Sequence, residues 1–277
     1  MKQIAAIVTV RNGGFFLQKW IDFYGRQFGE KNLFVTLDGV DQDVPPAPNV
    51  NYITTPHRPL PRLQGDKLRA AYLSAQARIL FMKGYDVVVA TDIDEYIVVD
   101  PQIGHSLAEY LSSISGTDSL SSLGLDVVQN LDHEDGLIVD EPWLKQRNFA
   151  QITARYTKPN IIFTPLNWGS GMHRIKGKNF QIDPNLYMIH TGMIDAKAAK
   201  LIGSADDRVS QGWSAHQSRR EQVFQRIRCE RAYDGDMLFP RVRRTMSLFR
   251  PIYAWNKPGH PTRNSIIRLP QRFEEAL

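Results

Sequence analysis

Residues 4–10 form an uninterrupted apolar and β-prone run, Ile-Ala-Ala-Ile-Val-Thr-Val, and shorter runs of the same kind follow at 33–37 and 87–90. Strands that are apolar along their whole length, rather than at alternate positions, are typical of a parallel sheet that helices cover on both faces. This pattern constrains the chain more than any other feature of its sequence. We therefore predict an α/β fold in which helices connect the strands.

Two amphipathic segments separate these strands. Over residues 15–28, large apolar side chains recur at spacings of three and four, and glycines flank the segment on both sides. A second segment has the same spacing, and we expect a helix over residues 66–82 with Asp66 as its N-cap. Two prolines predict an irregular loop over residues 57–65 before this second helix.

With a further strand at 50–54, the first 90 residues read as strand, helix, strand, strand, helix, strand. This order begins an open, doubly wound sheet, in which ligands bind at the carboxyl ends of the strands. We divide the chain into a core at 1–200, with a nucleotide-binding half at 1–100 and an acceptor half at 101–200. The remainder, 201–277, is predicted to be an arginine-rich helical extension followed by a tail that wraps the core.

Length and composition fit an ordinary folded protein, because 42% of the 277 residues are hydrophobic. No segment approaches the about 20 consecutive apolar residues that span a bilayer, and no export signal precedes the first strand. We therefore expect a cytoplasmic protein. Cys229 is the single cysteine, which excludes an internal disulfide and a cysteine-based zinc site.

Positive charge is concentrated between Arg208 and Arg250, where ten arginines face four acidic residues. The planar guanidinium group suits phosphates and carboxylates, so this segment predicts a polyanionic partner: a sugar nucleotide, a lipid-linked diphosphate or an anionic membrane surface. A solvated helix face with local ion pairs is the plainer interpretation. Nucleic acid is not expected, because the arginines lack interleaved aromatic residues and no binding-module signature is present.

Asp92 and Asp94 stand two residues apart where the run at 87–90 ends. Side chains i and i+2 of an extended chain point to the same face, so both carboxylates can bind one hard cation. Such a cation could bridge the phosphates of an activated substrate. Isolated Asp-x-Asp sequences also occur in solvated turns, so other parts of the chain must decide between these interpretations.

Several motifs resemble those of glycosyltransferases with the GT-A fold, and within them the large inverting family 2. Residues 8–13, Val-Thr-Val-Arg-Asn-Gly, resemble the first strand and loop of that family, and Trp20 and Tyr24 match aromatic positions of its first helix. Residues 37–41, Leu-Asp-Gly-Val-Asp, resemble its second-strand acidic turn. The run Asp-Ile-Asp-Glu-Tyr at 92–96 resembles the Asp-x-Asp-Glu-Phe version of its metal motif.

The resemblance continues beyond the acidic motif and spans about residues 4–195. Lys158-Pro159, the segment Trp-Gly-Ser-Gly-Met-His at 168–173 and the segment Leu-Tyr-Met-Ile-His at 186–190 are similar to segments of bacterial members. Gly14 departs from the residue that many members carry after Arg-Asn. The resemblance implies a GT-A core, a mixed Rossmann-like sheet flanked by helices.

The resemblance also implies a metal-dependent transfer from a nucleotide-diphosphate sugar, with UDP-sugars favoured. Mn²⁺ or Mg²⁺ would neutralise the diphosphate leaving group as a Lewis acid. Asp94 is expected to contact the metal directly, and Asp92 to contact the donor ribose or a metal-bound water. His190 is a candidate third ligand or phosphate contact, and His173 a candidate donor contact. A structural role for either histidine is the alternative.

Other donor contacts are expected at the ends of the first two strands and in the second helix. Thr9, Val10 and Arg11 would line the pocket for base and ribose, with Asp38 accepting hydrogen bonds. Arg11 could instead pair with Asp38 or Asp92 to neutralise their carboxylates.

Two basic residues at the start of the second helix complete the donor set. Lys67 and Arg69 could approach the diphosphate or the donor sugar. Exposed positions in a first helical turn are the plainer interpretation for both.

An inverting transfer needs a carboxylate that deprotonates the acceptor hydroxyl. Asp126, at the edge of a strand-like run, is the first candidate. Asp132, Glu134 and Asp135 in the next loop are alternatives, although this polar segment could be a plain surface loop.

The predicted function is therefore transfer of a sugar to a saccharide or glycolipid acceptor in polysaccharide biosynthesis, with peripheral contact at the inner face of the membrane. Two rivals remain. A nucleotidyltransferase should carry a glycine-rich, basic phosphate loop, which the Arg-Asn-Gly-Gly run at 11–14 is too short to supply. A non-catalytic carbohydrate-binding protein on the same fold would lack the metal carboxylates, which are both present here.

Overall fold

The computed structural model describes residues 1–203, 214–259 and 265–277. Its N-terminal half is built on four parallel strands in the spatial order β4-β1-β2-β3. Their bounds are β1 Ile4–Val10, β2 Leu33–Asp38, β3 Asn51–Thr55 and β4 Val87–Ala90. The parallel α/β arrangement predicted from the apolar runs is therefore confirmed.

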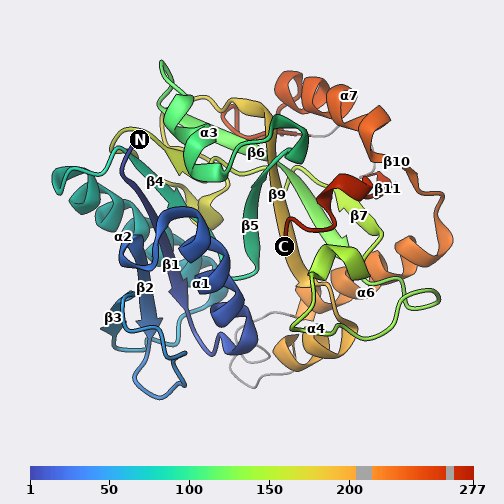
Figure 1. Cartoon of the computed structure of the whole chain (residues 1–277), viewed down its shortest axis with the longest axis horizontal. Helices are drawn as coiled ribbons and strands as arrows, with labels where there is room; N and C mark the ends of the chain where they lie inside the picture. The colour runs from blue at the N-terminus through green and yellow to red at the C-terminus, as the bar shows by residue number, and fades with distance from the viewer. Residues whose placement is uncertain (204–213, 260–264) are drawn as a thin grey trace.

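Two helices cover opposite faces of these strands (Figure 1). Helix α1 (Gly14–Phe28) packs on the face to which Ala6 and Val8 of β1 belong, through Leu17 and Trp20. Helix α2 (Arg62–Met82) packs on the other face. Its contacts form a second cluster of buried residues, which includes Ala5, Ile7, Ala70, Leu73, Ala77, Leu80, Val88 and Ala90. Alternate residues of β1 thus enter two separate cores, which explains why every position of this strand is apolar or small.

The start of α2 differs from the prediction. The helix begins at Arg62, directly after Pro61, and not at Asp66. Proline is disfavoured inside a helix but is compatible with its very start, because the first amides have no partner within the helix. The predicted loop at 57–65 is therefore shorter, and one more helical turn precedes the residues that face the acidic motif.

The second half of the core extends the sheet with antiparallel and parallel strands. Strand β6 (Ser119–Val128) is central, because it pairs antiparallel with β7 and β8 and parallel with β9. Strand β8 also pairs antiparallel with β4 and so joins the two halves. The further bounds are β5 Glu95–Val99, α3 Leu107–Ser113, β7 Phe149–Ile152, β8 Ile161–Ile162 and β9 Ile182–Met193. The sheet is therefore mixed, as the resemblance implied.

The C-terminal segment contains the predicted helices and also enters the sheet. Its described residues include three helices, α4 (Ala196–Gly203), α6 (Ser214–Cys229) and α7 (Gly235–Leu248). The short strand β10 (Tyr233–Asp234) lies between α6 and α7, and β11 (Ile266–Arg268) follows α7. Strand β11 pairs antiparallel with β7, and β10 pairs with β11. The predicted helical extension is present, and the segment in addition supplies one edge of the sheet. The domain boundary near residue 200 stays a prediction.

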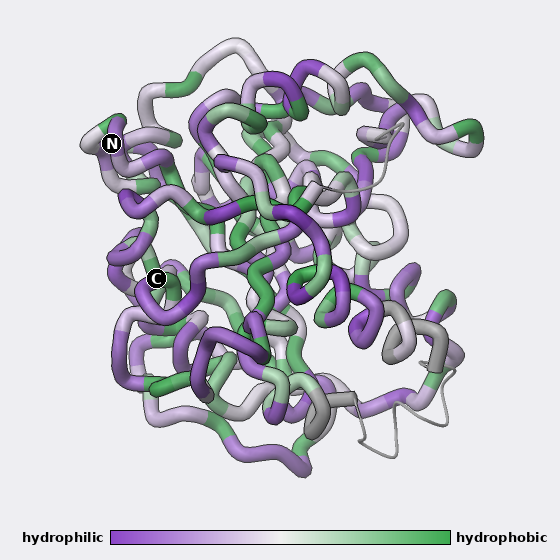
Figure 2. Tube along the Cα trace, turned by 90° about the vertical axis from the view of Figure 1, so that its right-hand side faces the viewer, coloured by the Kyte–Doolittle hydropathy of each residue, from purple (hydrophilic) through white to green (hydrophobic). Residues whose placement is uncertain are grey.

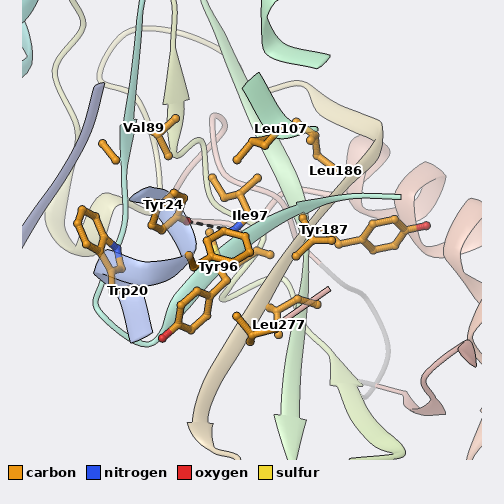
Figure 3. Packing of buried hydrophobic residues seen from close by; sticks show 14 of the residues in the cluster. Trp20, Tyr24, Val89, Tyr96, Ile97, Leu107, Leu186, Tyr187 and Leu277 are labelled. Atoms are coloured by element: carbon orange, nitrogen blue, oxygen red, sulfur yellow. Dashed lines mark hydrogen bonds between the residues drawn. The ribbon is translucent and has the colours of Figure 1, made fainter. Parts of the chain in front are cut away.

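The end of the segment lies in the main core. Leu277 is buried in the same cluster as Tyr96 and Tyr187 (Figure 3). Its carbonyl oxygen accepts a hydrogen bond of 2.6 Å from the Trp143 amide. Five short 3-10 turns complete the described part of the chain: η1 Glu30–Asn32, η2 Pro101–Ile103, η3 Trp143–Gln146, η4 Ser170–Met172 and η5 Gln271–Phe273.

Among the described residues, the structure contains no helix with the length and apolar character needed to cross a bilayer.

Candidate active site

The carboxyl ends of the parallel strands place several predicted residues along one edge of the sheet. Asp38 ends β2, Arg11 follows β1, and Asp92 lies two residues after β4. Because β1 lies between β2 and β4, these residues occupy neighbouring positions at the same edge. This is the edge at which sheets of this kind bind ligands.

Helix α1 holds the acidic turn from one side. The indole nitrogen of Trp20 donates a hydrogen bond of 2.8 Å to the Thr91 hydroxyl, one residue before Asp92. The Tyr24 hydroxyl lies 3.1 Å from the carbonyl oxygen of Glu95, to which it donates. The two aromatic residues that carried the family resemblance in this helix therefore fix both ends of the turn.

Two cations hold Asp92. Its Oδ1 lies 2.7 Å from the Arg69 guanidinium, and its Oδ2 lies 3.1 Å from the Lys158 ammonium. Lys158 is buried and also contacts the fully buried carboxylate of Glu95. Burial alone would raise the pKa of Asp92, but Arg69 and Lys158 outweigh it and hold that pKa well below its usual range. Asp92 is therefore ionised, with an oxygen engaged by each cation.

Asp94 faces a different partner. Its Oδ2 lies 3.3 Å from Nε2 of His190, and the other ring nitrogen, Nδ1, lies 2.6 Å from Oδ1 of Asp126. The sheet explains this meeting, because His190 on β9 is the register partner of Asp126 on β6. Thr191 fixes Asp94 further, since its amide donates a hydrogen bond of 2.8 Å to the Asp94 carbonyl oxygen.

The i, i+2 argument expected both carboxylates of the acidic motif to point to the same face. They instead contact different partners. Asp92 faces Arg69 and Lys158, whereas Asp94 faces His190. The reason is local: residues 92–95 form a turn, with the Glu95 amide bonded to the Asp92 carbonyl oxygen, and not an extended strand. Both side chains remain reachable, at 24% exposure for Asp92 and 23% for Asp94.

His190 is buried between charges and an aromatic ring. Burial lowers its pKa, but Asp94 and Asp126 outweigh this effect and raise the pKa to about 10. The ring of Tyr156 stacks on the imidazole with centroids 3.7 Å apart. Tyr156 can approach because Gly124 has no side chain: a Cβ there would lie 2.4 Å from the backbone of Tyr156.

Gly192 has no side chain, and the Asp94–His190 pair occupies the space that a side chain there would fill. A Cβ at this position would lie 2.8 Å from both Oδ2 of Asp94 and Cε1 of His190. Real Cβ atoms do not approach other atoms so closely, so a side chain at residue 192 would push the two groups aside. This glycine was not singled out by its sequence context.

These residues fit a divalent ion in part. Oδ2 of Asp94 and Nε2 of His190 converge, and Asp126 holds the other ring nitrogen, which is the arrangement that orients a metal-ligating histidine. Within residues 1–203, 214–259 and 265–277, no group of three or more potential side-chain ligands assembles. Mg²⁺ and related ions are commonly held by one or two carboxylates and completed by substrate phosphates and water, which this pair permits.

The predicted nucleotide-binding residues lie at the ends of β1 and β2. Arg11 pairs with Asp41 through two contacts of 2.5 and 2.9 Å and donates to the carbonyl oxygen of Asp38. The Asp38 carboxylate lies 2.9 Å from Nδ1 of His57. The prediction that Arg11 pairs with the Asp38 or Asp92 carboxylate was therefore wrong, because the turn after β2 brings Asp41 to it.

Two further donor candidates belong to β1 itself. Val10 is buried in the main core. The Thr9 hydroxyl oxygen is also buried, and it has no hydrogen-bond partner among the described residues. Thr9 thus offers a polar group to a ligand, and Val10 can offer little beyond its backbone.

Lys67 and His173 lie apart from the Asp94–His190 pair. Lys67 is exposed on α2, whereas Arg69 two residues later turns to Asp92. Nδ1 of His173 lies 3.0 Å from the Arg155 carbonyl oxygen. Burial, then Lys158 and Lys257, lower the pKa of His173 well below its usual value, so this ring is neutral at pH 7.

The candidate bases have distinct environments. Asp126 is buried against His190. Asp132 forms an exposed ion pair with Arg228 at 2.8 Å. Glu134 accepts hydrogen bonds from two main-chain amides and so fixes its own loop. The Asp135 side chain is exposed.

Part of the arginine-rich segment can be placed. Arg208, where the segment begins, lies outside the described residues. Arg220 on α6 is one of the charges that lower the pKa of Asp94, after burial has raised it and His190 has lowered it. Arg226 pairs with Glu230 within α6. The segment therefore reaches the candidate site through Arg220, whereas Arg226 forms an ion pair within its own helix.

Sequence reasoning assigned no role to Lys158, Tyr156 or Arg220. Lys158 was noted only as part of a motif of the resembling family. No spacing in the chain connects these residues to Asp92 and Asp94, because they approach only through the pairing of distant strands.

Comparisons with known proteins match solved structures but no sequence family. No protein-family model matches the chain, and no curated protein matches its sequence. Among solved structures, S. aureus TarS aligns with 12% identity and a TM-score of 0.32, over 81% of this chain and 43% of that chain. Mannose-1-phosphate geranyltransferase from Thermus thermophilus aligns with 10% identity and a TM-score of 0.29, over 76% of this chain and 67% of that one. The chain thus spans less than half of TarS, and likenesses at these scores carry no argument about its activity.

Proposed function

We propose that the chain is a glycosyltransferase that moves a sugar from a nucleotide-diphosphate donor to an acceptor hydroxyl with the help of Mn²⁺ or Mg²⁺. The observation that carries this proposal is the pairing of Asp94 with His190 beside Asp92, at the edge where the parallel strands end. Both aspartates are partly exposed there, so a ligand can reach them.

Asp94 and His190 would hold the ion through Oδ2 and Nε2, which requires His190 to lose the Nε2 proton that it shares with Asp94. When bound, a divalent ion would neutralise the donor diphosphate and stabilise it as a leaving group. Asp126 accepts the Nδ1 hydrogen bond of His190 and so keeps Nε2 directed at Asp94. We therefore assign Asp126 an orienting role, because a base must contact the acceptor hydroxyl and this carboxylate is buried behind the imidazole.

Asp92 would act on the donor side without binding the ion directly. It fixes the guanidinium of Arg69 and the ammonium of Lys158, and both groups therefore stand beside the place proposed for the diphosphate. The Arg69 side chain is partly exposed and can donate to a phosphate oxygen in a fixed geometry. Contact between Asp92 and the ion through water remains part of this proposal.

The base and ribose of the donor would lie at the ends of β1 and β2. The buried Thr9 hydroxyl offers a hydrogen bond, and Asp38 offers a carboxylate that is partly exposed. The Arg11–Asp41 ion pair would lie at the border of this binding region, and its two charges neutralise each other. A UDP-sugar is the donor we favour from the family resemblance.

For inverting transfer, Asp135 is the candidate base to test from the loop after β6. Its side chain is exposed, and its carbonyl oxygen accepts a hydrogen bond from Gln129. Gln129 also accepts from the amide of Ala196, just beyond the end of β9 that carries His190. The acceptor class that we propose is a saccharide or glycolipid.

A thermal-shift panel tests the donor and metal assignments together. Nucleoside diphosphates and their sugars, with and without Mn²⁺, are added to the purified chain. A ligand at about 100 times its Kd should raise the melting temperature by at least about 5 °C, and only with metal. His190→Gln and Asp94→Asn should remove this response, because each deletes one of the two protein ligands.

Gly192→Ala provides a sharper variant of the same test. It keeps both ligands but places a methyl group between them, so the metal-dependent rise should disappear while the circular dichroism spectrum is retained. Gly136→Ala is the matched control, because a Cβ there would meet its nearest neighbour at 3.8 Å. A metal-dependent rise that survives all three site variants contradicts the assignment.

The rival functions differ in their products. A glycosyltransferase releases a nucleoside diphosphate from the donor, whereas a nucleotidyltransferase forms or consumes pyrophosphate. Ligand binding without either product would indicate the non-catalytic alternative. Chromatography of the nucleotide products after incubation with an acceptor mixture separates the three.

A further inference from the structure

Helix α7 and the loop after it form an exposed surface that combines apolar and basic side chains. Met237, Arg241, Arg244 and Leu248 follow one another at spacings of four, three and four, and all four are exposed. The opposite face of the helix is buried through Phe239, Val242 and Met246. The outer face of α7 is therefore half apolar and half cationic.

The loop after α7, residues 249–257, carries large apolar side chains into solvent. Ile252 is fully exposed, Tyr253 is 76% exposed and Trp255 is 60% exposed. Figure 2 shows this part of the chain as a loop that projects from the body of the molecule at the upper right. Three such neighbouring side chains form an exposed apolar patch of the kind that marks a binding surface. We call residues 249–257 the aromatic loop.

The aromatic loop is held in place by its own contacts. The amide of Gly259 donates to the carbonyl oxygen of Phe249 at 3.0 Å and closes the loop at its base. Inside it, Nε of Arg250 donates to the carbonyl oxygen of Trp255 at 2.7 Å, and the guanidinium lies over the ring of Phe180. Buried Asn256 donates to the carbonyl oxygen of Ile175. The apolar side chains are therefore presented outward by an ordered loop.

The charge of this surface has one sign. Residues 237–257 contain five cationic side chains and no acidic one. Arg243 turns inward over Tyr187, whereas Arg241 and Arg244 remain exposed beside the apolar residues. Tryptophan and tyrosine favour the interfacial region of a bilayer, and arginine next to them attracts anionic headgroups.

We propose that the aromatic loop and the outer face of α7 dock the protein on an anionic lipid surface, with Ile252, Tyr253 and Trp255 entering the interface. Charge complementarity favours lipid over a second copy of the chain, because two copies would bring the same cationic surface together. This proposal does not depend on transferase activity.

Vesicle flotation of the full chain tests the proposal. Vesicles of phosphatidylcholine alone are compared with vesicles that contain about 30% phosphatidylglycerol. The chain should float with the anionic vesicles and not with the neutral ones. Ile252→Ser/Trp255→Ser and, separately, Arg241→Glu/Arg244→Glu should each weaken binding at least about tenfold.

Each variant has a matched control elsewhere on the surface. Met82→Ser/Ile138→Ser removes two exposed apolar side chains, and Lys31→Glu/Lys83→Glu makes the same charge change as the arginine variant. Both controls should bind like the unmodified chain. Failure of the unmodified chain to bind, equal binding to neutral vesicles, or equal losses in the controls would overturn the proposal.

Sedimentation velocity of the same proteins examines the self-association alternative. A dimer that the loop variants dissociate, without vesicle binding, would assign the surface to a second copy and overturn lipid docking. The thermal shift with nucleotides should be unchanged in the loop variants, so failure here and failure of the proposed activity remain separate results.

Discussion

Lys158 is a buried cation between two carboxylates, Asp92 and Glu95. An ion pair of this kind contributes little compared with an apolar replacement of the whole group, but removal of one partner leaves an uncompensated charge in the interior. The residue therefore stabilises the fold and the candidate site by the same contacts.

We predict that Lys158→Met lowers the free energy of unfolding by about 3–5 kcal/mol, measured by urea denaturation. Lys178→Met is the control, because its pair with Asp118 is about half exposed and should contribute less than about 1 kcal/mol. Lys158→Met/Glu95→Gln should recover part of the loss, since it removes the stranded charge. Equal effects of Lys158→Met and Lys178→Met would show that Glu95 is not ionised beneath the site.

At the residue scale, the sequence identified the acidic motif but not its partners. Asp92 and Asp94 stand two residues apart in the chain, so a local pattern could find them. Lys158 and His190 reach them from distant segments, and this choice of partners depends on strand register. The pairing of Arg11 with Asp41 likewise depends on the shape of one turn.

At the scale of secondary-structure elements, one arginine links the C-terminal 3-10 turn η5 to the core. Arg272 contacts both oxygens of Asp100 at 2.7 and 2.9 Å and also pairs with Asp236 at the start of α7. Burial raises the pKa of Asp100, but the hydrogen bonds from Arg272 outweigh it and lower that pKa below the usual value. Three elements thus share one ion-pair network.

This network predicts a pH dependence of stability. Because the pKa of Asp100 is lower in the folded than in the unfolded chain, its contribution is present above the ordinary carboxylate pKa of about 3.9 and is lost as the pH falls through the folded-state value. Arg272→Met should therefore destabilise the protein at pH 7 and flatten the fall in stability below about pH 4, measured by urea denaturation.

Lys145→Met is the control for this experiment, since the Lys145–Glu275 pair lies nearby and is exposed on both sides. It should leave the pH profile almost unchanged. An unchanged profile in Arg272→Met would contradict the role assigned to Asp100.

The positions of helices and strands along the chain were predicted better than the pairing of strands within the sheet. Continuous apolar runs located β1, β2 and β4, and helical spacing located α1. The start of α2 was missed, because Pro61 was read as a helix breaker although it stands where a helix can begin. The pairing of β6 with β9 and the entry of β11 into the sheet have no local signal, because each joins segments far apart in the chain.

On the scale of the whole molecule, the C-terminal segment and the core share one hydrophobic cluster. Phe273 and Leu277 are buried in the same cluster as residues of β1 and β9. A segment that supplies both a strand and core side chains should unfold together with the rest of the protein.

We predict that Phe273→Ala destabilises the whole chain by about 3–5 kcal/mol in a single transition, with tryptophan fluorescence and circular dichroism coinciding. Ile252→Ala, at a fully exposed position, should change stability by less than about 0.5 kcal/mol. Two separate transitions, with only one affected by Phe273→Ala, would instead support an independent C-terminal domain.

The parallel pairing of β6 with β9 also determines when the candidate site can exist during folding. His190 and Asp126 are 64 residues apart and meet only as register partners of these two strands. Contacts between such distant segments form slowly, because the chain loses conformational entropy in closing a long loop before the contacts can stabilise it. Refolding chains should therefore acquire helical signal first and the metal-dependent response to nucleotide last, so that ligand capture reports the completed sheet.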